Sequence, residues 1–235
     1  MTVILTESGL DIDLSGDPPA PAALAALTAF AADTAIARLT VGGETAFQNR
    51  LPELRAGEAT LYPTPGGFLQ AVAAAEAALG DAVAAAIGQD GPVADLFSGI
   101  GTFTLRIARQ VPVLAMDSDA DALAALERAA RAARGLKAVT VRRRDLMRNP
   151  PTPAELAGFA SVVFDPPRAG ARRLVEQLAL SQVPRIAAVS CNPATFARDA
   201  RTLIDGGYRL DWVQPVDQFL FSPHIELAAA FVRAG

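Results

Sequence analysis

Apolar and polar positions along this chain follow two different patterns, and the change between them comes near residue 64. Before that point, residues 3–5 and 10–14 alternate with the period of two that is typical of strands. Prolines between positions 17 and 21 separate them from an alanine-rich stretch near 22–33, which predicts a helix, and residues 35–41 predict a further strand. This first part carries the weakest signal about function.

Beyond residue 64, predicted helices and strands alternate. The predicted helices cover residues 68–87, 102–110, 119–134, 170–180 and 195–205. The predicted strands cover residues 92–97, 113–116, 139–142, 161–164, 185–191, 210–213 and 227–232. Strands separated by helices specify a parallel sheet with helices on both faces. Because no helix separates the last two strands, we expect an α/β, doubly wound, Rossmann-like sheet with an antiparallel C-terminal hairpin.

Composition narrows the class of protein. With 235 residues, 51% of them hydrophobic and 20% charged, the chain can bury a large core as a globular protein. No apolar run approaches the ~18 residues needed to cross a bilayer, and the first residues do not resemble a signal peptide. The only cysteine is Cys191 and the only histidine is His224, which excludes an internal disulfide and argues against any metal site. We expect a cytoplasmic protein that binds neither membrane nor metal.

The net charge of −4 conceals an asymmetry between the two parts of the chain. Residues 1–94 carry 3 basic and 11 acidic side chains, whereas residues 95–235 carry 18 basic and 14 acidic ones. A polyanion, if it binds at all, would therefore meet the C-terminal part, where Arg142, Arg143, Arg144 and Arg168 are found. Runs of charge are also common on ordinary solvated surfaces, so this signal alone is weak.

A glycine-containing loop follows the predicted strand 92–97 and opens the next helix. Gly99 and Gly101 let the backbone approach a ligand, and Asp117, 22 residues after Asp95, ends the next strand, where an acid takes a ribose hydroxyl pair. Residue 104 is Thr, so the third glycine of a dinucleotide site is missing. The loop therefore favours S-adenosylmethionine over NAD. Asp145, after the third strand, is placed either to meet the adenine edge or to serve as a plain cap or surface acid.

Asp165-Pro166-Pro167-Arg168 follows the predicted strand 161–164. The two prolines fix a rigid, extended loop because neither has an N–H to donate. Such a loop would hold the side chains of Asp165 and Arg168 in the ligand crevice. The alternative is that Asp165 only caps a turn, but a strand-end acid beside a cofactor loop favours a functional interpretation.

Cys191 ends the predicted strand 185–191, just before a turn and the start of a helix. At a helix start, free N–H groups and the helix dipole lower the pKa of a thiol, although a lone Cys is more often a small buried hydrophobe. Glu226 precedes the last predicted strand and by itself would be a solvated strand-end residue. Together, Cys191 and Glu226 supply a nucleophile and a base on adjacent strand ends.

Four motifs occur in the order of a known family, and they cover about residues 60–235 of this chain. They are the run 95–101, Asp165-Pro166-Pro167-Arg168, Ser190-Cys191-Asn192-Pro193 with Ala197-Arg198-Asp199, and His224-Ile225-Glu226. Together they resemble the RNA uracil-5-methyltransferase family, whose members make 5-methyluridine in tRNA or 23S rRNA. Phe68-Leu69-Gln70 is similar to that family's aromatic-x-Gln segment, in which the Gln contacts S-adenosylmethionine.

The resemblance implies a class I methyltransferase domain over residues 58–235 and a covalent mechanism. The Cys191 thiolate would add to carbon 6 of uracil, and Glu226 would later remove the proton from carbon 5. Asp165 and Arg168 would hold the substrate base, which must leave its stack to reach Cys191. The residues implied to bind the cofactor are Gln70, Asp95, Phe97, Gly99, Gly101, Asp117, Asp145 and Asp165.

The chain also departs from the family. Most relatives carry an N-terminal RNA-binding β-barrel, and several bind an iron–sulfur cluster through four upstream cysteines, which this sequence lacks. Residues 1–57 resemble only part of the family's central, substrate-side region. A missing RNA-binding module or a partner would then bring the RNA. The alternatives are a remnant that binds cofactor or a partner without modifying RNA, and a methyltransferase for another base or a protein.

Overall fold

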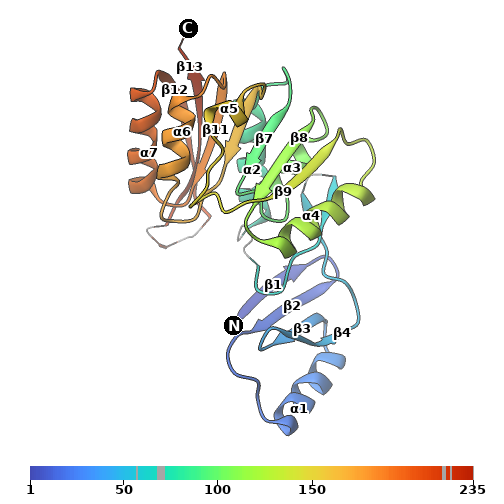
Figure 1. Ribbon diagram of the computed structural model, residues 1–235. Helices are drawn as coiled ribbons and strands as arrows, with labels where there is room; N and C mark the ends of the chain where they lie inside the picture. Colours follow the sequence, from blue (N-terminus) through green and yellow to red (C-terminus); the bar gives the residue numbers. More distant parts are fainter. Residues whose placement is uncertain (57, 68–71, 219–220, 223, 235) are drawn as a thin grey trace.

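The computed structural model describes residues 1–56, 58–67, 72–218, 221–222 and 224–234 (Figure 1). The N-terminal unit is a four-stranded sheet in the order β1-β2-β3-β4 with one helix. Its elements are β1 (Thr2–Thr6), β2 (Gly9–Leu14), α1 (Pro21–Ala32), β3 (Ile36–Val41) and β4 (Glu44–Gln48). The strands β2 and β3 run parallel because α1 carries the chain back between them, and α1 packs against β3 and β4.

A short hairpin connects the two parts of the molecule. It consists of β5 (Leu54–Ala56) and β6 (Ala59–Leu61), which pack against the helices α3 (Thr102–Ile107) and α4 (Ala120–Ala132). Leu61 is completely buried there. The predicted division between residues 57 and 58 falls within this hairpin and stays a prediction.

The larger part is a seven-stranded sheet in the order β12-β13-β11-β10-β7-β8-β9. Its strands are β7 (Val93–Leu96), β8 (Val113–Asp117), β9 (Val139–Arg143), β10 (Ser161–Phe164), β11 (Arg185–Ser190), β12 (Tyr208–Val216) and β13 (Glu226–Arg233). The strands β7 to β11 are mutually parallel, whereas β13 runs antiparallel to both of its neighbours. The predicted α/β sheet with an antiparallel C-terminal strand pair is confirmed.

Helices cover both faces of this sheet, so its central strands are buried on both sides. One face packs against α6 (Arg172–Leu180), α7 (Pro193–Asp205) and the short α5 (Pro153–Leu156). The other face packs against α2 (Ala73–Ile87) and α3, and α4 covers the end near β8. This burial explains why the central strands have almost continuous apolar runs. Among the described helices, none combines the length and apolarity that a membrane span requires.

The observed elements agree with the predicted ones except at several ends. The predicted helix 68–87 is shorter, because α2 starts at Ala73 and Val72 is extended; residues 68–71 lie outside the described residues. The predicted helix 102–110 ends as a helix at Ile107, after which the chain turns to bury Val111. The strands β4, β5 and β6 and the helix α5 were not predicted, although the Thr152–Glu155 capping box of α5 is visible in the sequence.

Candidate active site

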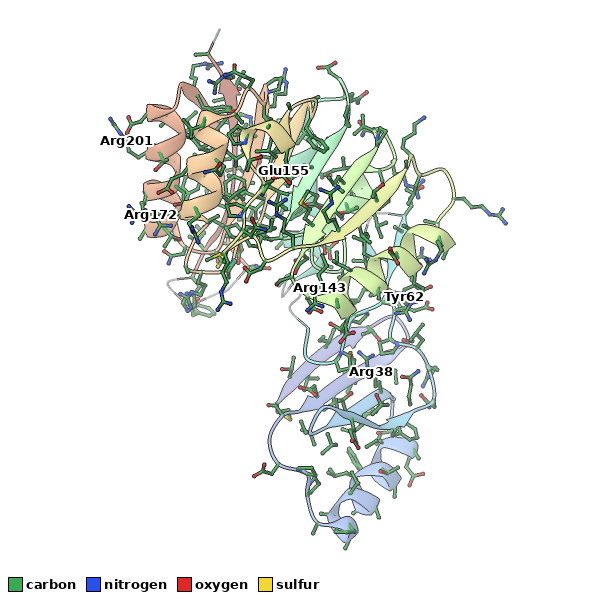
Figure 2. The ribbon with its side chains drawn as sticks, in the orientation of Figure 1. Arg38, Tyr62, Arg143, Glu155, Arg172 and Arg201 are labelled. Carbon is green, nitrogen blue, oxygen red and sulfur yellow. The ribbon has the colours of Figure 1, made fainter. Side chains whose placement is uncertain are left out.

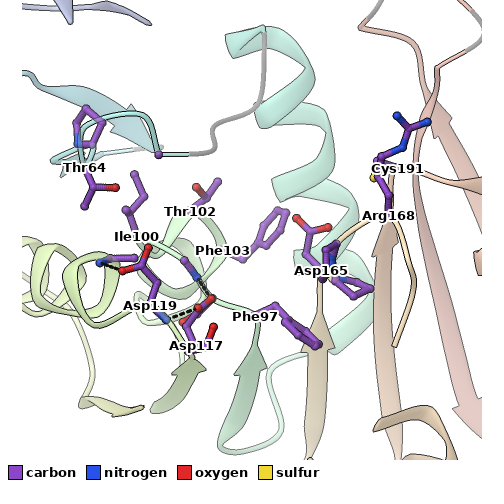
Figure 3. A pocket seen from close by; sticks show the side chains of 18 of the residues that line it. Thr64, Phe97, Ile100, Thr102, Phe103, Asp117, Asp119, Asp165, Arg168 and Cys191 are labelled. Carbon is purple, nitrogen blue, oxygen red and sulfur yellow. Dashed lines mark hydrogen bonds between the residues drawn. The ribbon is translucent and has the colours of Figure 1, made fainter. Parts of the chain in front are cut away.

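A cavity of about 610 Å³ opens where the carboxyl ends of β7, β8, β10 and β11 meet the start of β13 (Figure 3). This is the edge at which open α/β sheets bind ligands. Seven of the residues predicted from the sequence line the cavity: Phe97, Gly99, Asp117, Asp165, Arg168, Cys191 and Glu226. The sheet therefore brings together motifs that are up to 129 positions apart along the chain.

The loop after β7 is shaped by Asp117. One oxygen of its carboxylate accepts a hydrogen bond from the backbone N–H of Gly99 at 2.9 Å, and the other accepts one from the N–H of Asp119 at 2.9 Å. Gly99 has a φ of +52°, and a Cβ there would meet no atom within 4 Å, so the loop leaves open space on the cavity side. Phe97 has a φ of +64°, which a bulky residue rarely adopts, and it also lines the cavity.

Gly101 and Asp95 stabilise this loop through contacts with α4 and α3. A Cβ on Gly101 would lie 2.3 Å from Cδ1 of Leu126, and its φ is +96°, so glycine is required there for packing against α4. Asp95 is buried and accepts a hydrogen bond from the hydroxyl of Thr104, which holds the start of α3. Burial raises the pKa of Asp95 to about 7. Thr104, noted in the sequence only as a missing glycine, is thus the partner of Asp95.

Asp145 was predicted to bind the cofactor, but its carboxylate makes hydrogen bonds within its own turn. The Asp145 carboxylate accepts hydrogen bonds from the backbone N–H groups of Met147 at 3.1 Å and Arg148 at 3.0 Å, so it caps its own turn. Within the described part of the chain, Met147 lines the cavity and Asp145 does not. A contact of Asp145 with the adenine edge stays a prediction. Gln70 lies outside the described residues.

Cys191 directly follows β11, and Glu226 begins β13, the antiparallel neighbour of β11. Ser190 on β11 pairs with Leu227 on β13, so Cys191 and Glu226 follow directly beyond the last paired residues. Cys191 precedes Asn192, whose side chain caps α7 by accepting the N–H of Ala194 at 3.0 Å. Glu226 is only 2% exposed and still lines the cavity. The strand register thus positions a thiol and a carboxyl group at one end of the cavity.

Electrostatics around Cys191 contradict one expectation from the sequence. Burial raises the pKa of the Cys191 thiol, and the nearby carboxyl groups of Glu226 and Asp165 raise it further. Lowering of this pKa at a helix start was therefore a wrong prediction, because burial and two acidic neighbours outweigh the lowering effects of the Cys191 backbone N–H and of Arg168.

The two carboxyl groups also influence each other. Burial, followed by the charges of Glu226 and Asp95, raises the pKa of Asp165 to about 7. Burial raises the pKa of Glu226 as well, although a hydrogen bond from Gln218 opposes this effect. With a pKa of about 7, the Asp165 carboxyl group can exchange protons near neutral pH, which suits a general acid or base.

The loop that carries Asp165 and Arg168 is fastened to α7. The Arg168 carbonyl accepts hydrogen bonds from the Asn192 amide at 3.1 Å and from the Thr195 hydroxyl at 3.3 Å. The Arg168 guanidinium also lies 3.2 Å from Nδ1 of His224. Arg198 and Asp199, which belong to one of the sequence motifs, also make hydrogen bonds to this loop. The sequence alone did not explain this role.

The cavity has the size and lining of a small-molecule binding site. Its volume is in the range of small-molecule sites, and its walls combine the apolar Phe97, Ile100 and Phe103 with the carboxylate of Asp117. Figure 3 shows Asp165 between this group and Cys191. One end of the cavity thus combines apolar side chains with a carboxylate, and the other end carries the thiol of Cys191 and the carboxyl groups of Asp165 and Glu226.

Comparisons with known proteins agree with this geometry. A family model described as tRNA (Uracil-5-)-methyltransferase matches residues 56–233. An uncharacterized RNA methyltransferase of Brucella suis biovar 1 is 46% identical over 234 residues, which cover 99% of this chain and 56% of that relative. The 23S rRNA (uracil(1939)-C(5))-methyltransferase of Pseudomonas fluorescens is 42% identical over 176 residues, covering 71% of this chain and 38% of that protein.

The fold of this chain is also similar to that of a solved structure. The Pyrococcus abyssi tRNA (uracil-54, C5)-methyltransferase, in complex with S-adenosyl-L-homocysteine, matches with a TM-score of 0.76 and 26% sequence identity. The match covers 95% of this chain and 56% of that one. The chain spans about half the length, 56%, of the Brucella suis relative that it matches, and less of the Pseudomonas fluorescens enzyme.

Proposed function

The chain belongs to the tRNA (uracil-5-)-methyltransferase family, and from that premise we propose that it methylates carbon 5 of a uridine in tRNA or 23S rRNA. The proposal rests on the placement of Cys191 and Glu226. They lie directly beyond Ser190 and Leu227, the last residues that pair between β11 and β13, and both line the cavity. Methyl transfer to an oxygen or a nitrogen needs no such nucleophile. Carbon 5 of uracil needs one, because it is a poor nucleophile until carbon 6 is attacked.

The proposed cofactor is S-adenosylmethionine, which supplies an electrophilic methyl group when bound. Gly99 and Asp117 would hold its nucleoside part at the open space beside the loop, and Met147 would contact its adenine. The relative from Pyrococcus abyssi binds the demethylated form of this cofactor. Support for the cofactor therefore comes from both the cavity and a relative.

The residues of the chain perform the covalent steps on the base. The Cys191 thiol gives its proton to the solvent in the open cavity, and the thiolate forms a bond to carbon 6 while the C5–C6 electron pair shifts to make carbon 5 nucleophilic. After carbon 5 has gained a methyl group, Glu226 accepts the proton from carbon 5. The C5–C6 double bond then forms again, and the bond from carbon 6 to sulfur breaks to return the thiolate. Asp165 is proposed to hold the uracil edge, and Arg168 the RNA beside it.

A covalent trap tests this assignment. Transcripts of tRNA and of 23S rRNA that contain 5-fluorouridine are incubated with the protein and labelled S-adenosylmethionine, and adducts that survive denaturation are measured. We expect an adduct, because the fluorine on carbon 5 cannot leave as a proton. Since the chain has one cysteine, Cys191→Ala should abolish the adduct, and peptide mass spectrometry should locate it on Cys191.

The outcomes separate the alternatives. An adduct that persists in Cys191→Ala overturns the assignment of the nucleophile. Methyl transfer to another base or to protein supports the broader methyltransferase interpretation instead. Cofactor binding without adduct or methyl transfer on either RNA supports the remnant that binds but does not modify.

A further inference from the structure

Arg38 connects the N-terminal sheet to the wall of the cavity. It lies on β3 opposite Asp11 on β2, and its guanidinium donates to both carboxylate oxygens of Asp11 at 2.8 and 2.6 Å. The same guanidinium donates to the backbone carbonyl of Pro63 at 2.8 Å. Arg38 is 6% exposed and Asp11 is 3% exposed, so all three bonds are buried. Figure 2 shows Arg38 in the N-terminal unit, on the side that faces Tyr62.

Pro63 begins a thin segment that separates two cavities. Pro63, Thr64 and Gly67 line the cavity of about 610 Å³ that contains Asp117 and Cys191. Thr64 and Gly67 also line a second cavity of about 550 Å³, whose other wall includes residues of the N-terminal sheet such as Asp13. Pro63 is buried, whereas Pro65 and Gly66 are exposed, so the contacts at Pro63 help to fix the position of the segment.

The contacts of this segment and of Tyr62, the residue before it, come from two different parts of the molecule. The ring of Tyr62 stacks under the guanidinium of Arg128 on α4, with 4.7 Å between the ring centroid and the carbon of that group. From the N-terminal sheet come the hydrogen bond of Arg38 and the close approach of Asp13 to Gly66, where a Cβ would lie 2.8 Å from the Asp13 carboxylate. The segment is thus held between the methyltransferase part and the N-terminal sheet.

We propose that Arg38 is a positioning residue for the cofactor, which makes the N-terminal sheet part of the cofactor site. By fixing Pro63, Arg38 holds in place a residue that lines the cavity. A wall that is already in place lets the cofactor bind without ordering that segment, which raises affinity. This inference rests on the proposed function for the identity of the cofactor. It gives a role to the part of the sequence with the weakest signal.

The test must distinguish positioning from stability. Arg38→Met leaves a buried, unpaired Asp11 and is expected to destabilise the fold. The double variant Asp11→Leu with Arg38→Met removes both charges, and such replacements of buried ion pairs are often neutral or stabilising. Both variants lack the hydrogen bond to Pro63. The matched control is Thr40→Val, because Thr40 is completely buried on the same strand and its hydroxyl has no partner.

The measurement is the Kd of S-adenosyl-L-homocysteine by titration calorimetry, with melting temperatures recorded for each variant. We expect the double variant to melt near the wild type and yet to bind about tenfold more weakly. We expect Thr40→Val to bind like the wild type. A double variant with wild-type Kd overturns the inference and leaves the proposed function intact. A wild-type protein that does not bind S-adenosyl-L-homocysteine overturns the proposed cofactor together with the inference.

Discussion

The carboxylate of Asp199 accepts a hydrogen bond from the backbone N–H of Ala171 at 2.8 Å. Asp199 lies on α7, which follows Cys191, and Ala171 ends the loop that carries Asp165. The other oxygen of Asp199 binds the Arg198 guanidinium, and that group also donates to the Ala169 carbonyl at 3.2 Å. One buried side chain therefore fixes the distance between the two loops that carry the proposed chemistry.

Asp199→Ala should destabilise the protein by about 1–3 kcal/mol, because the N–H of Ala171 would lose its buried partner. Urea denaturation measures this change. The control is Asp205→Ala on the same helix, which breaks the exposed Arg201–Asp205 pair and should cost about 0–1 kcal/mol. Equal losses in the two variants would contradict a structural role for Asp199.

Glu226→Gln should separate methyl transfer from the later release of the RNA. An amide cannot accept the proton from carbon 5, so methyl transfer can occur while release of the RNA slows. We expect a covalent complex with ordinary uridine RNA to accumulate, measured by denaturing gel electrophoresis with labelled S-adenosylmethionine. Cys191→Ala serves as the control and should give no complex. Release at the wild-type rate in Glu226→Gln would remove Glu226 from the mechanism.

Alkylation of Cys191 by iodoacetamide reports directly on the local electrostatics. Since Cys191 is the only cysteine, the rate of thiol loss at about pH 7.5 measures its thiolate fraction. Glu226 raises the pKa of Cys191, so Glu226→Gln should lower that pKa and speed alkylation. Arg168→Gln should act in the opposite direction, because Arg168 lowers the same pKa. Equal rates in all three proteins would show that the carboxyl group does not affect the thiol.

The fold could be predicted from the sequence because its signals are local. Apolar runs separated by helical patterns specify the sheet, and the motif residues that follow the strands line one cavity because parallel strands end at the same edge. The same reasoning failed for the pKa of Cys191. That pKa depends on Glu226 and Asp165, which approach Cys191 only after β10, β11 and β13 have paired. The contact of Arg38 with Pro63 is equally non-local, and no sequence pattern marks it.

Asp95 should make the stability of the protein depend on pH. Its pKa is raised to about 7 by burial, whereas an unfolded Asp titrates near 3.9. Between those values the folded state binds more protons than the unfolded one, so the free energy of unfolding falls as the pH rises toward 7. Asp95→Asn keeps an oxygen that can accept the Thr104 hydroxyl and cannot ionise. Its melting temperature relative to wild type should therefore be higher at about pH 8 than at about pH 5.

Thr104→Val provides the opposite test of the same pair. The Thr104 hydroxyl donates to the Asp95 carboxylate and lowers its pKa, which partly offsets the effect of burial. Without that donor, the charged form of Asp95 loses its stabilising partner, so the loss of stability from about pH 5 to about pH 8 should be larger than in the wild type. In the double variant Asp95→Asn with Thr104→Val, no carboxyl group remains at this position to ionise. The additional pH dependence should then disappear, and its persistence would assign the titration to Asp165 or Glu226 instead.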